Sequence, residues 1–531
     1  MGKATTNRDG ARDAKKQRQN LFLQFRAPRA LAVCGLLFAL RAAAAEVRFD
    51  GSYRLRFNTD TDLALDDTGF LSGQKTWMEH RLRLTPKIVE IGEQGGIEIQ
   101  ASFDILSGIV AGDVSNTFAG YGLTDLTRRN GLRAEGFDFR HLFTQIRLPI
   151  GLLQLGQMPS HWGMGMVTNS GEGEDNVDFG DVRYGDIVDR LLFATRPFVG
   201  LLGPKSELAK QLGLAVSADL VYRDRYANLV QRNGGGLQWG DIAWQFVSAL
   251  IYDPSDATRA GLYVARRVET FAASGGDLHI WVFDATVRHA MPLQSGLLLS
   301  LEGEAAQIYG GTSHAPNLSA GSARVSQQGA ALRVQAAKGL FEAELEGGYA
   351  SGDADPFDDR ASAFSMNRDY KVGLVLFDQV LMFQSQNAAR RLSNPQLVGT
   401  PPPGLDLLPT EGAVTDAMYL KPTLRWKPPL WNGSLRVVGS VLFARAPQPV
   451  LDPYWTLISS APVNAFGHGA GQNYGTEIDG AIGYHGRLSG PLGFEAGVQA
   501  GYLFPGNAFT RSDGSRMPGA YATRFRATFT F

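Results

Sequence analysis

The sequence contains a single cysteine, Cys34, which excludes an intramolecular disulfide framework. Its net charge is only −1 at pH 7, so no bulk field favours nucleic acid as a partner. After residue 45 it also lacks any apolar run of about 18 residues, the length that a transmembrane helix requires. Only a closed sheet could then cross a bilayer, because an open sheet edge in lipid would leave backbone groups without partners.

A strictly two-faced segment is present at the end of the chain. Over residues 520–531, apolar and aromatic side chains alternate with polar ones, and Arg524 and Arg526 lie on the polar face. The chain then stops at Phe531. This last strand resembles the assembly signal of bacterial outer-membrane barrels, which commonly end in Phe. The resemblance implies that the outer-membrane assembly machinery is a partner of this strand.

The first 45 residues have the composition of an export signal. A long basic region is followed by an apolar segment at 30–40 and by the small residues Ala43, Ala44 and Ala45. This order predicts a signal peptide over 1–45, with the mature chain beginning near Glu46.

The two-faced pattern of the last strand recurs along the whole chain. Residues 47–57 alternate as cleanly as 520–531, and short Gly, Pro, Asn and Asp turns alternate with long polar loops. This asymmetry predicts an all-β fold, a transmembrane antiparallel up-and-down β-barrel with short periplasmic turns and long extracellular loops. A β-propeller is disfavoured because no repeat of about 40–50 residues is found. The predicted strands lie near 47–57, 78–84, 97–105, 138–149, 151–159, 188–196, 212–223, 241–252, 259–269, 278–289, 297–308, 324–336, 340–351, 414–427, 434–445, 474–485, 492–504 and 520–531.

One apolar segment, residues 372–383, tests the strand count. Counting it as a strand gives an odd number and puts the two chain ends on opposite sides of the membrane, whereas bacterial barrels have even numbers. Its poor alternation also disfavours a strand. We therefore predict about 18 strands, a single barrel over 46–531, and a long loop at 352–413 that folds into the barrel mouth. A barrel of this size leaves an aqueous interior.

Charged residues on the polar faces of the strands are the candidate pore lining. The hypothesis is a pore with a basic wall facing an acidic one. The alternative is that these charges pair between neighbouring strands and only keep the wall solvated. The basic candidates are Arg48, Arg54, Arg56, Arg81, Arg83, Lys87, Lys421, Arg425, Arg436, Arg524 and Arg526, and the acidic candidates are Glu302, Glu304, Glu342, Glu344 and Glu346.

Two further stretches carry a resemblance. The loop Trp162-Gly163-Met164-Gly165, with Asp189-Arg190 after it, resembles a family of porin-like outer-membrane proteins that often have Arg where this chain has Gln157. The segments 350–355 and 474–480 resemble 18-stranded porins of the alginate-export type. The resemblance implies the barrel fold and identifies no substrate.

Two acidic loops are candidates for cation binding. Asp353, Asp355, Asp358 and Asp359 match only the start of a calcium-binding EF-hand loop, with no closing Glu in register, so a solvated loop is the favoured alternative. The second loop is predicted to carry external charge that meets divalent cations around lipopolysaccharide. Its members are Glu172, Glu174, Asp175, Asp178 and Asp181.

An enzymatic function has little support in the sequence. A barrel hydrolase would need a serine beside a histidine, and only Ser160 and His161 are adjacent. The strands contain no Gly-x-Ser-x-Gly elbow. No enzyme activity and no cofactor are expected.

The sequence thus predicts a porin or channel of the Gram-negative outer membrane, in contact with membrane lipid and lipopolysaccharide. It would pass small hydrophilic solutes by passive or substrate-biased diffusion, with a bias toward anions. The alternatives are a structural or surface-binding barrel with a plugged lumen and, less favoured, a barrel-embedded hydrolase.

Overall fold

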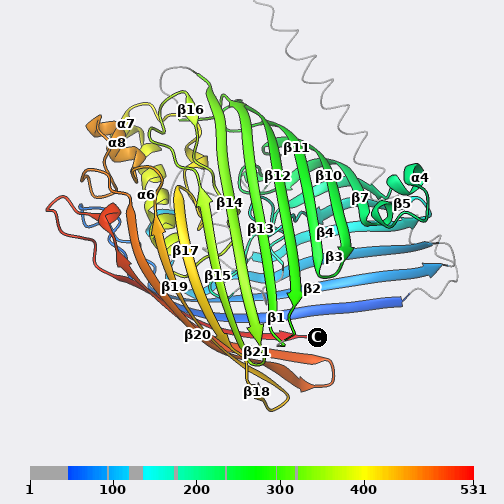
Figure 1. The fold of residues 1–531 in the computed structure, drawn as a ribbon. Helices are drawn as coiled ribbons and strands as arrows, with labels where there is room; N and C mark the ends of the chain where they lie inside the picture. Colours follow the sequence, from blue (N-terminus) through cyan, green and yellow to red (C-terminus); the bar gives the residue numbers. More distant parts are fainter. Residues whose placement is uncertain are drawn as a thin grey trace, which may run out of the picture.

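A computed structural model describes residues 46–92, 95–118, 135–172, 178–233, 236–294, 296–316 and 321–531. The predicted signal peptide, 1–45, lies outside the described residues. The described chain forms one closed barrel of tilted strands (Figure 1).

Eighteen long strands make up the barrel wall within the described residues. They are β1 (Glu46–Asp60), β2 (Thr76–Gly92), β3 (Gly95–Gly112), β4 (Glu135–Leu148), β5 (Gly151–Pro159), β6 (Ile187–Thr195), β7 (Leu212–Arg223), β10 (Ile242–Ser255), β11 (Thr258–Thr270), β12 (Asp277–Pro292), β13 (Leu298–Thr312), β14 (Ala323–Lys338), β15 (Phe341–Ala350), β17 (Ala417–Trp426), β19 (Gly433–Arg445), β20 (Asn473–Ser489), β21 (Leu492–Pro505) and β22 (Ala520–Thr530).

The remaining elements are short and lie in the connections. The short strands are β8 (Val230–Asn233), β9 (Gly236–Trp239), β16 (Arg360–Ala361) and β18 (Pro429–Leu430). The helices are η1 (Asn116–Phe118), α4 (Phe198–Leu202), α5 (Glu207–Gln211), η3 (Leu376–Leu381), α6 (Met382–Leu392), α7 (Pro395–Val398), η4 (Leu405–Leu407), α8 (Pro453–Ser459) and η5 (Asn507–Phe509). No helix of the described residues is both long and apolar enough to span a membrane.

The wall closes where its first and last strands pair. β1 is antiparallel to β2 on one side and to β22 on the other, with Arg56 opposite Arg526. Both chain ends of the wall therefore lie at the rim that carries the short turns. The predicted fold class and strand number are confirmed.

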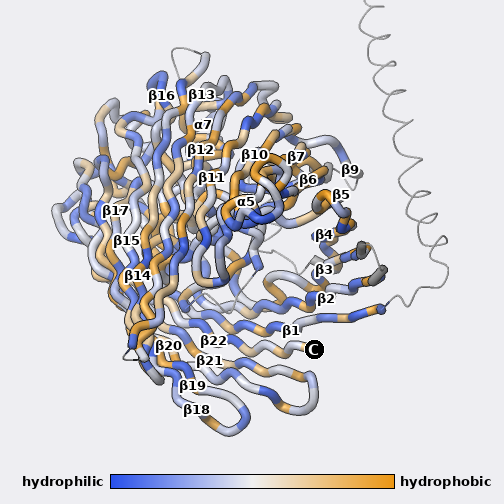
Figure 2. The backbone as a smooth tube through the Cα atoms, turned by 45° about the vertical axis from the view of Figure 1, so that its right-hand side comes forward, coloured by the Kyte–Doolittle hydropathy of each residue, from blue (hydrophilic) through white to orange (hydrophobic). Residues whose placement is uncertain are grey.

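The outer surface of the wall is apolar. Figure 2 shows hydrophilic and hydrophobic residues alternating along the strands. Side chains such as Phe246, Trp281 and Leu424 are exposed on the outward face, whereas their inward neighbours are buried or polar. An apolar, aromatic exterior of this kind suits a bilayer.

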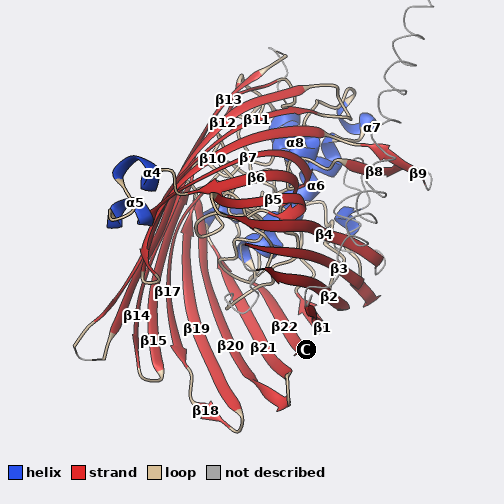
Figure 3. Ribbon diagram, turned by 90° about the vertical axis from the view of Figure 1, so that its right-hand side faces the viewer, coloured by secondary structure: helices blue, strands red, loops and turns tan. Residues whose placement is uncertain are grey.

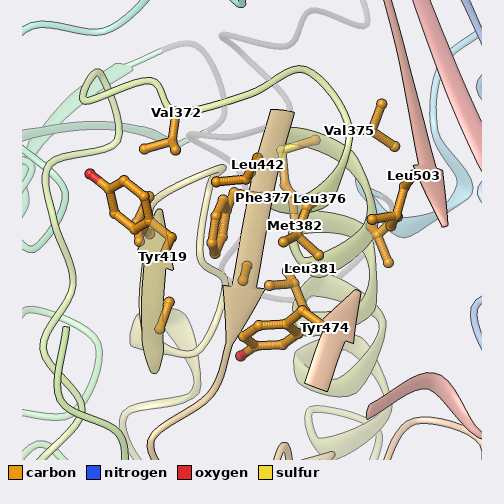
Figure 4. Close-up of a cluster of buried hydrophobic side chains, with 14 of the residues drawn as sticks. Val372, Val375, Leu376, Phe377, Leu381, Met382, Tyr419, Leu442, Tyr474 and Leu503 are labelled. Atoms are coloured by element: carbon orange, nitrogen blue, oxygen red, sulfur yellow. The ribbon is translucent and has the colours of Figure 1, made fainter. Parts of the chain in front are cut away.

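Two long connections fold into the ring. We call residues 160–186, between β5 and β6, the constriction loop, and residues 351–416, between β15 and β17, the lumen segment. Residues 372–383, the segment that tested the strand count, contain η3 and the start of α6 and no strand. Their apolar side chains pack against inward-facing residues such as Tyr419, Leu442 and Tyr474, so a hydrophobic core lies inside the barrel (Figure 4).

Candidate functional site: the barrel interior

The motif Trp162-Gly163-Met164-Gly165 anchors the constriction loop to the inner wall. The indole Nε1 of Trp162 donates to Asp284 Oδ1 on β12 at 3.0 Å. The carboxylate of Glu304 on β13 accepts backbone N–H groups from Met164, from Met166 at 3.4 Å and from Val167 at 3.2 Å. Glu304, predicted to line a pore, is thus engaged in holding the loop.

Glycine is required at two points of this anchor. Gly163 has φ +56°, and a Cβ there would collide with the Glu304 carboxylate. A Cβ on Gly261 of β11 would come within 2.6 Å of the Trp162 ring. The glycines are therefore needed because the loop backbone packs closely against Glu304 and the Trp162 ring packs closely against β11.

The other arm of the constriction loop carries two buried carboxylates to the opposite wall. Asp178 Oδ2 accepts from Arg425 Nε of β17 at 2.7 Å, and Asp178 Oδ1 accepts from Arg436 of β19. Asp181 lies 2.5 Å from an Nη atom of Arg56 and 3.4 Å from one of Arg526. The loop therefore joins two sides of the barrel. Trp162 anchors it to β12, and Asp178 and Asp181 form ion pairs with arginines of β17, β19, β1 and β22.

The arginines control the charge state of these two aspartates. Burial alone would raise the pKa of Asp181, but the charges of Arg56 and then Arg54 outweigh it and hold that pKa well below its usual range. Burial of Asp178 is likewise outweighed by Arg425, and its pKa is lowered. Both carboxylates are ionised at neutral pH.

These two residues correct the prediction for the second acidic loop. Asp178 and Asp181 are buried against arginines, so their assignment to external charge is wrong. Glu172 is exposed, with Oε1 3.5 Å from His141 Nδ1. Glu174 and Asp175 lie outside the described residues.

The lumen segment is held by inward-facing acids of the wall. Glu477 on β20 accepts the backbone N–H groups of Leu374, Val375 and Leu376 at 2.6–2.8 Å, just before and at the first turn of η3. Glu346 on β15 accepts from the Tyr370 hydroxyl at 2.9 Å. The lumen segment in turn holds the constriction loop, because Asp369 accepts the backbone N–H groups of residues 183, 184 and 185.

The predicted basic residues all have acidic or aromatic neighbours where the structure gives their contacts. Arg48 and Lys87 lie near the short-turn rim, whereas Lys421 is buried with its Nζ 5.6 Å from the Phe179 ring centre. The ion pairs are Arg48–Glu46 at 2.8 Å, Lys87–Asp50 at 3.3 Å, Arg83–Asp104 at 2.7 Å, Arg54–Asp181 at 3.9 Å, Arg56–Glu79 at 2.7 Å, Arg524–Asp60 and Arg526–Glu495. Arg81 is buried on the inner wall.

The predicted acidic residues other than Glu304 pair with bases on the adjoining strands. Arg425 of β17 contacts Glu342 at 2.6 Å and Glu344 at 3.0 Å on β15, the neighbouring strand. Arg333 of β14 contacts Glu346 at 2.8 Å and Glu302 at 3.3 Å. Along β13 to β17 these charges are therefore paired between neighbouring strands, and Arg425 also contacts Asp178 of the constriction loop.

A small cavity of about 40 Å³ near β1 to β4 has an excess of positive charge. It is lined by Arg54, Arg56, Arg81, Arg140, Arg183 and Arg223, against Glu79, Asp104 and Asp138. Arg140 is buried, and its Nη1 donates to Tyr184 O at 3.3 Å. Its Nε and Nη2 have no hydrogen-bond partner among the residues that the structure describes.

A larger cavity of about 350 Å³ lies at the long-loop end, and we call it the mouth pocket. Its walls are mainly apolar, with Phe271, Ile280 and Ile308 on the barrel side and Leu381 on the lumen segment. Arg225 also lines it. The Nη2 of Arg225 donates to Pro409 O at 3.2 Å, but Nε and Nη1 have no partner within the described part of the chain.

Comparison with solved structures identifies the architecture. OpdK of Pseudomonas aeruginosa, solved with vanillate, superposes with a TM-score of 0.50 at 11% identity over 92% of this chain and 98% of that one. OccAB1 of Acinetobacter baumannii gives 0.49 at 10% identity over 91% and 96%. The fold is that of an outer-membrane porin. No protein-family model and no curated protein sequence matches the chain.

The porin-like fold and the apolar exterior agree with the predicted setting in an outer membrane. The further likeness to alginate-export porins is not confirmed by these matches. The segments that carried it have local roles in this porin-like barrel. Glu477 holds the lumen segment, and Tyr474 donates to Asp416 O at 3.1 Å.

The candidate metal and catalytic residues have structural partners. The acidic loop after β15 satisfies its own backbone, because Asp353 accepts from Asp355 N and Ser362 N. No group of three or more metal-binding side chains occurs in the described ranges. The remaining calcium candidates also have partners within the protein, since Asp355 and Asp358 accept backbone N–H groups and Asp359 contacts Arg324.

The two catalytic candidates are not paired with each other. Ser160 Oγ accepts from Arg190 at 3.0 Å, whereas His161 accepts from Ser170 N, so the two side chains have separate partners.

Sequence reasoning missed Arg140, Arg225 and the roles of Asp178 and Asp181. Alternation within 138–149 could have put Arg140 on the polar face. Arg225 and the two aspartates lie in loops, where no periodicity tells whether a side chain points into the lumen.

Proposed function

We propose that this barrel is an outer-membrane channel for small anionic solutes with an apolar body. The observation that carries the anionic bias is the cavity with six arginines and three carboxylates. Asp181 lies against Arg56 and adds a further negative charge beside this cavity, but the six arginines still outnumber the carboxylates. Fixed charge of one sign in a narrow, low-dielectric lumen raises the local concentration of solutes of the opposite sign.

The mouth pocket supports the apolar part of this proposal. Its apolar walls would accept a ring or short alkyl chain, and the positive charge of Arg225, which lines the pocket, would attract a carboxylate. Small aromatic carboxylates have this chemistry. The OpdK structure that shares the fold contains vanillate, which is one such compound.

The test is ion selectivity of the purified protein in planar bilayers. In a KCl gradient the wild type should favour Cl⁻ over K⁺, and Arg140→Gln should lower the permeability ratio by about sevenfold, because one unit charge about 7 Å from the path in water changes the permeabilities of Cl⁻ and K⁺ by about 2.7-fold each, in opposite directions. Arg140→Lys keeps the charge and should retain most of the bias.

Arg48→Gln is the matched control. Arg48 is exposed near the short-turn rim, on the same wall, and should change selectivity much less. Heat-modifiable migration in gel electrophoresis would show that each variant is folded. Equal ratios for wild type and folded Arg140→Gln would contradict the anionic bias.

The second candidate is a structural or surface-binding barrel with a plugged lumen. The hydrophobic core formed by the lumen segment inside the ring favours it. Reproducible single-channel conductance would exclude this candidate, and complete absence of conductance from folded protein would support it. A hydrolase is not supported, since Ser160 and His161 have separate partners.

Two partners remain part of the proposal. The outward aromatic residues Tyr521, Phe525 and Phe531 of the last strand are exposed, which would suit recognition by the assembly machinery. Lipopolysaccharide would contact the outward face near the long loops.

A further inference from the structure

The connection between β6 and β7 is an exception on the short-turn rim. Neighbouring strands at this rim are joined by residues such as 149–150, 256–257 and 339–340. Residues 196–211 instead form two short helices, α4 and α5, which we call the rim hairpin. Such an addition is not needed to join two antiparallel strands, because two residues suffice elsewhere on the same rim.

The rim hairpin lies outside the barrel. Figure 3 shows α4 and α5 projecting from the outer side of the wall, away from the lumen. α5 packs beside β7 and β10, and its one buried residue is Ala209. The hairpin therefore neither lines nor covers the solute path.

The exposed face of the rim hairpin is rich in leucine. Leu201 is 78% exposed, Leu202 58% and Leu208 51%. Ile150, on the β4–β5 turn of the same rim, is 71% exposed. These side chains continue the apolar outer surface of strands such as β6, where Leu191 is exposed toward lipid. Water is an unfavourable environment for so many clustered leucines.

Basic residues accompany the leucines. Arg196 and Lys205 are exposed, and Lys210 pairs with Glu207 at 2.8 Å. The hairpin thus has a net positive charge beside its apolar face. This combination is typical of segments that lie in a membrane interface, with apolar side chains toward the acyl chains and basic ones at phospholipid headgroups.

We propose that the rim hairpin is a membrane-interface anchor that lies in the phospholipid leaflet at the short-turn rim. Leu201, Leu202 and Leu208 enter the acyl boundary, and Arg196 and Lys205 bind anionic headgroups. The anchor fixes the depth of the wall at β6 and β7. A second copy of the chain is a poorer occupant, because two helices of this length present less than the about 800 Å² per partner of a standard interface.

Site-directed spin labelling tests the position of the hairpin. The full chain carrying Cys34→Ser is reconstituted in nanodiscs of phosphatidylethanolamine and phosphatidylglycerol, with single labels at Leu201→Cys, Leu208→Cys or Asp256→Cys. Asp256, in the β10–β11 turn, is an exposed control on the same rim. Labels at 201 and 208 should collide more with oxygen than with a water-soluble nickel complex, and the label at 256 should do the reverse.

Two results would overturn the proposal. One is a label at 201 that is as accessible to nickel as the label at 256. The other is dipolar broadening between labels at 201 in nanodiscs that hold two copies, which would make the hairpin an interface between copies. Heat-modifiable migration again confirms that each labelled barrel is folded.

The headgroup contact has its own readout. Replacing phosphatidylglycerol by phosphatidylcholine should lower the ratio of immersed to exposed label at 201, by about fivefold for each basic residue that contacts the anionic surface. Arg196→Glu combined with Lys205→Glu should remove this dependence on lipid charge. If the double variant keeps the full dependence, the assigned basic contacts are wrong.

Discussion

Trp162 of the constriction loop donates its indole N–H to Asp284 of β12 across 122 residues of sequence, at 3.0 Å. Together with Glu304 on the next strand, Asp284 fixes where the loop crosses the lumen. The loop position therefore depends on a few inward-facing side chains of β12 and β13, and under the proposed function it sets the width of the solute path.

Glu304→Gln should loosen the constriction loop. An amide oxygen is a weaker acceptor than a carboxylate for the backbone N–H groups of Met164, Met166 and Val167. A loss of about 1.5–3 kcal/mol would follow from weakening hydrogen bonds to a charged group. Single-channel recording should show larger and noisier conductance. Glu302→Gln, which removes only a partner of Arg333, is the control, and equal effects of both variants would contradict the assigned role.

Asp181→Asn should increase anion selectivity. The substitution removes the buried counter-charge of Arg54, Arg56 and Arg526 while keeping the shape of the side chain. The Cl⁻/K⁺ permeability ratio should rise by about sevenfold, by the Coulomb argument given above for Arg140. Glu172→Gln removes an exposed carboxylate from the same loop and should have little effect. An unchanged ratio in folded Asp181→Asn would mean that solutes do not pass this part of the wall.

Arg225→Met should weaken binding of aromatic carboxylates in the mouth pocket. Methionine keeps the apolar contact, but the guanidinium group that lines the pocket is lost. Block of the current by benzoate should need about tenfold more solute, which corresponds to one charge-assisted hydrogen bond of about 1.5 kcal/mol. Arg360→Met is the control, because Arg360 lines the same pocket but its side chain is exposed. Benzyl alcohol, which lacks the carboxylate, should not distinguish wild type from Arg225→Met.

Benzoate block should weaken as the pH rises through neutrality. Burial raises the pKa of Asp416, in the loop before β17, to about 7, and the nearby Asp353 carboxylate adds to the rise against a hydrogen bond from Gln448 N. Asp416 is therefore neutral below that pH and repels anions in the mouth pocket above it. The same raised pKa makes the folded state bind the proton more tightly than the unfolded chain, so stability falls as pH rises toward 7.

Recordings at roughly pH 6 and pH 8 bracket the titration of this group. In Asp416→Asn the block should lose most of its pH dependence. A full pH dependence in this variant would assign the titration to another group.

Much of the architecture could be predicted from local patterns. Alternation over 47–57 and 520–531 predicted the two strands that close the ring, and the parity of the strand count correctly removed 372–383 from the wall. Such predictions succeed because strand faces follow a two-residue period and a membrane barrel must satisfy every backbone group within its sheet.

The interior was less predictable. The sequence put Asp178 among external charges, whereas the fold buries it against Arg425, 247 residues away. The polar interior expected for a barrel is in fact lined by apolar residues such as Ile280 and Val282 along part of the wall.

The sequence by itself determined the wall: its strands, its two faces, its closure and its setting in a membrane. The tertiary structure alone decided what lies within it, namely which arginines are neutralised by the constriction loop and which, such as Arg140 and Arg225, have donors without a partner among the described residues. The physical reason is that strand geometry is periodic and local, whereas a loop is positioned by partners such as Glu304 and Glu477 that only the closed ring brings close.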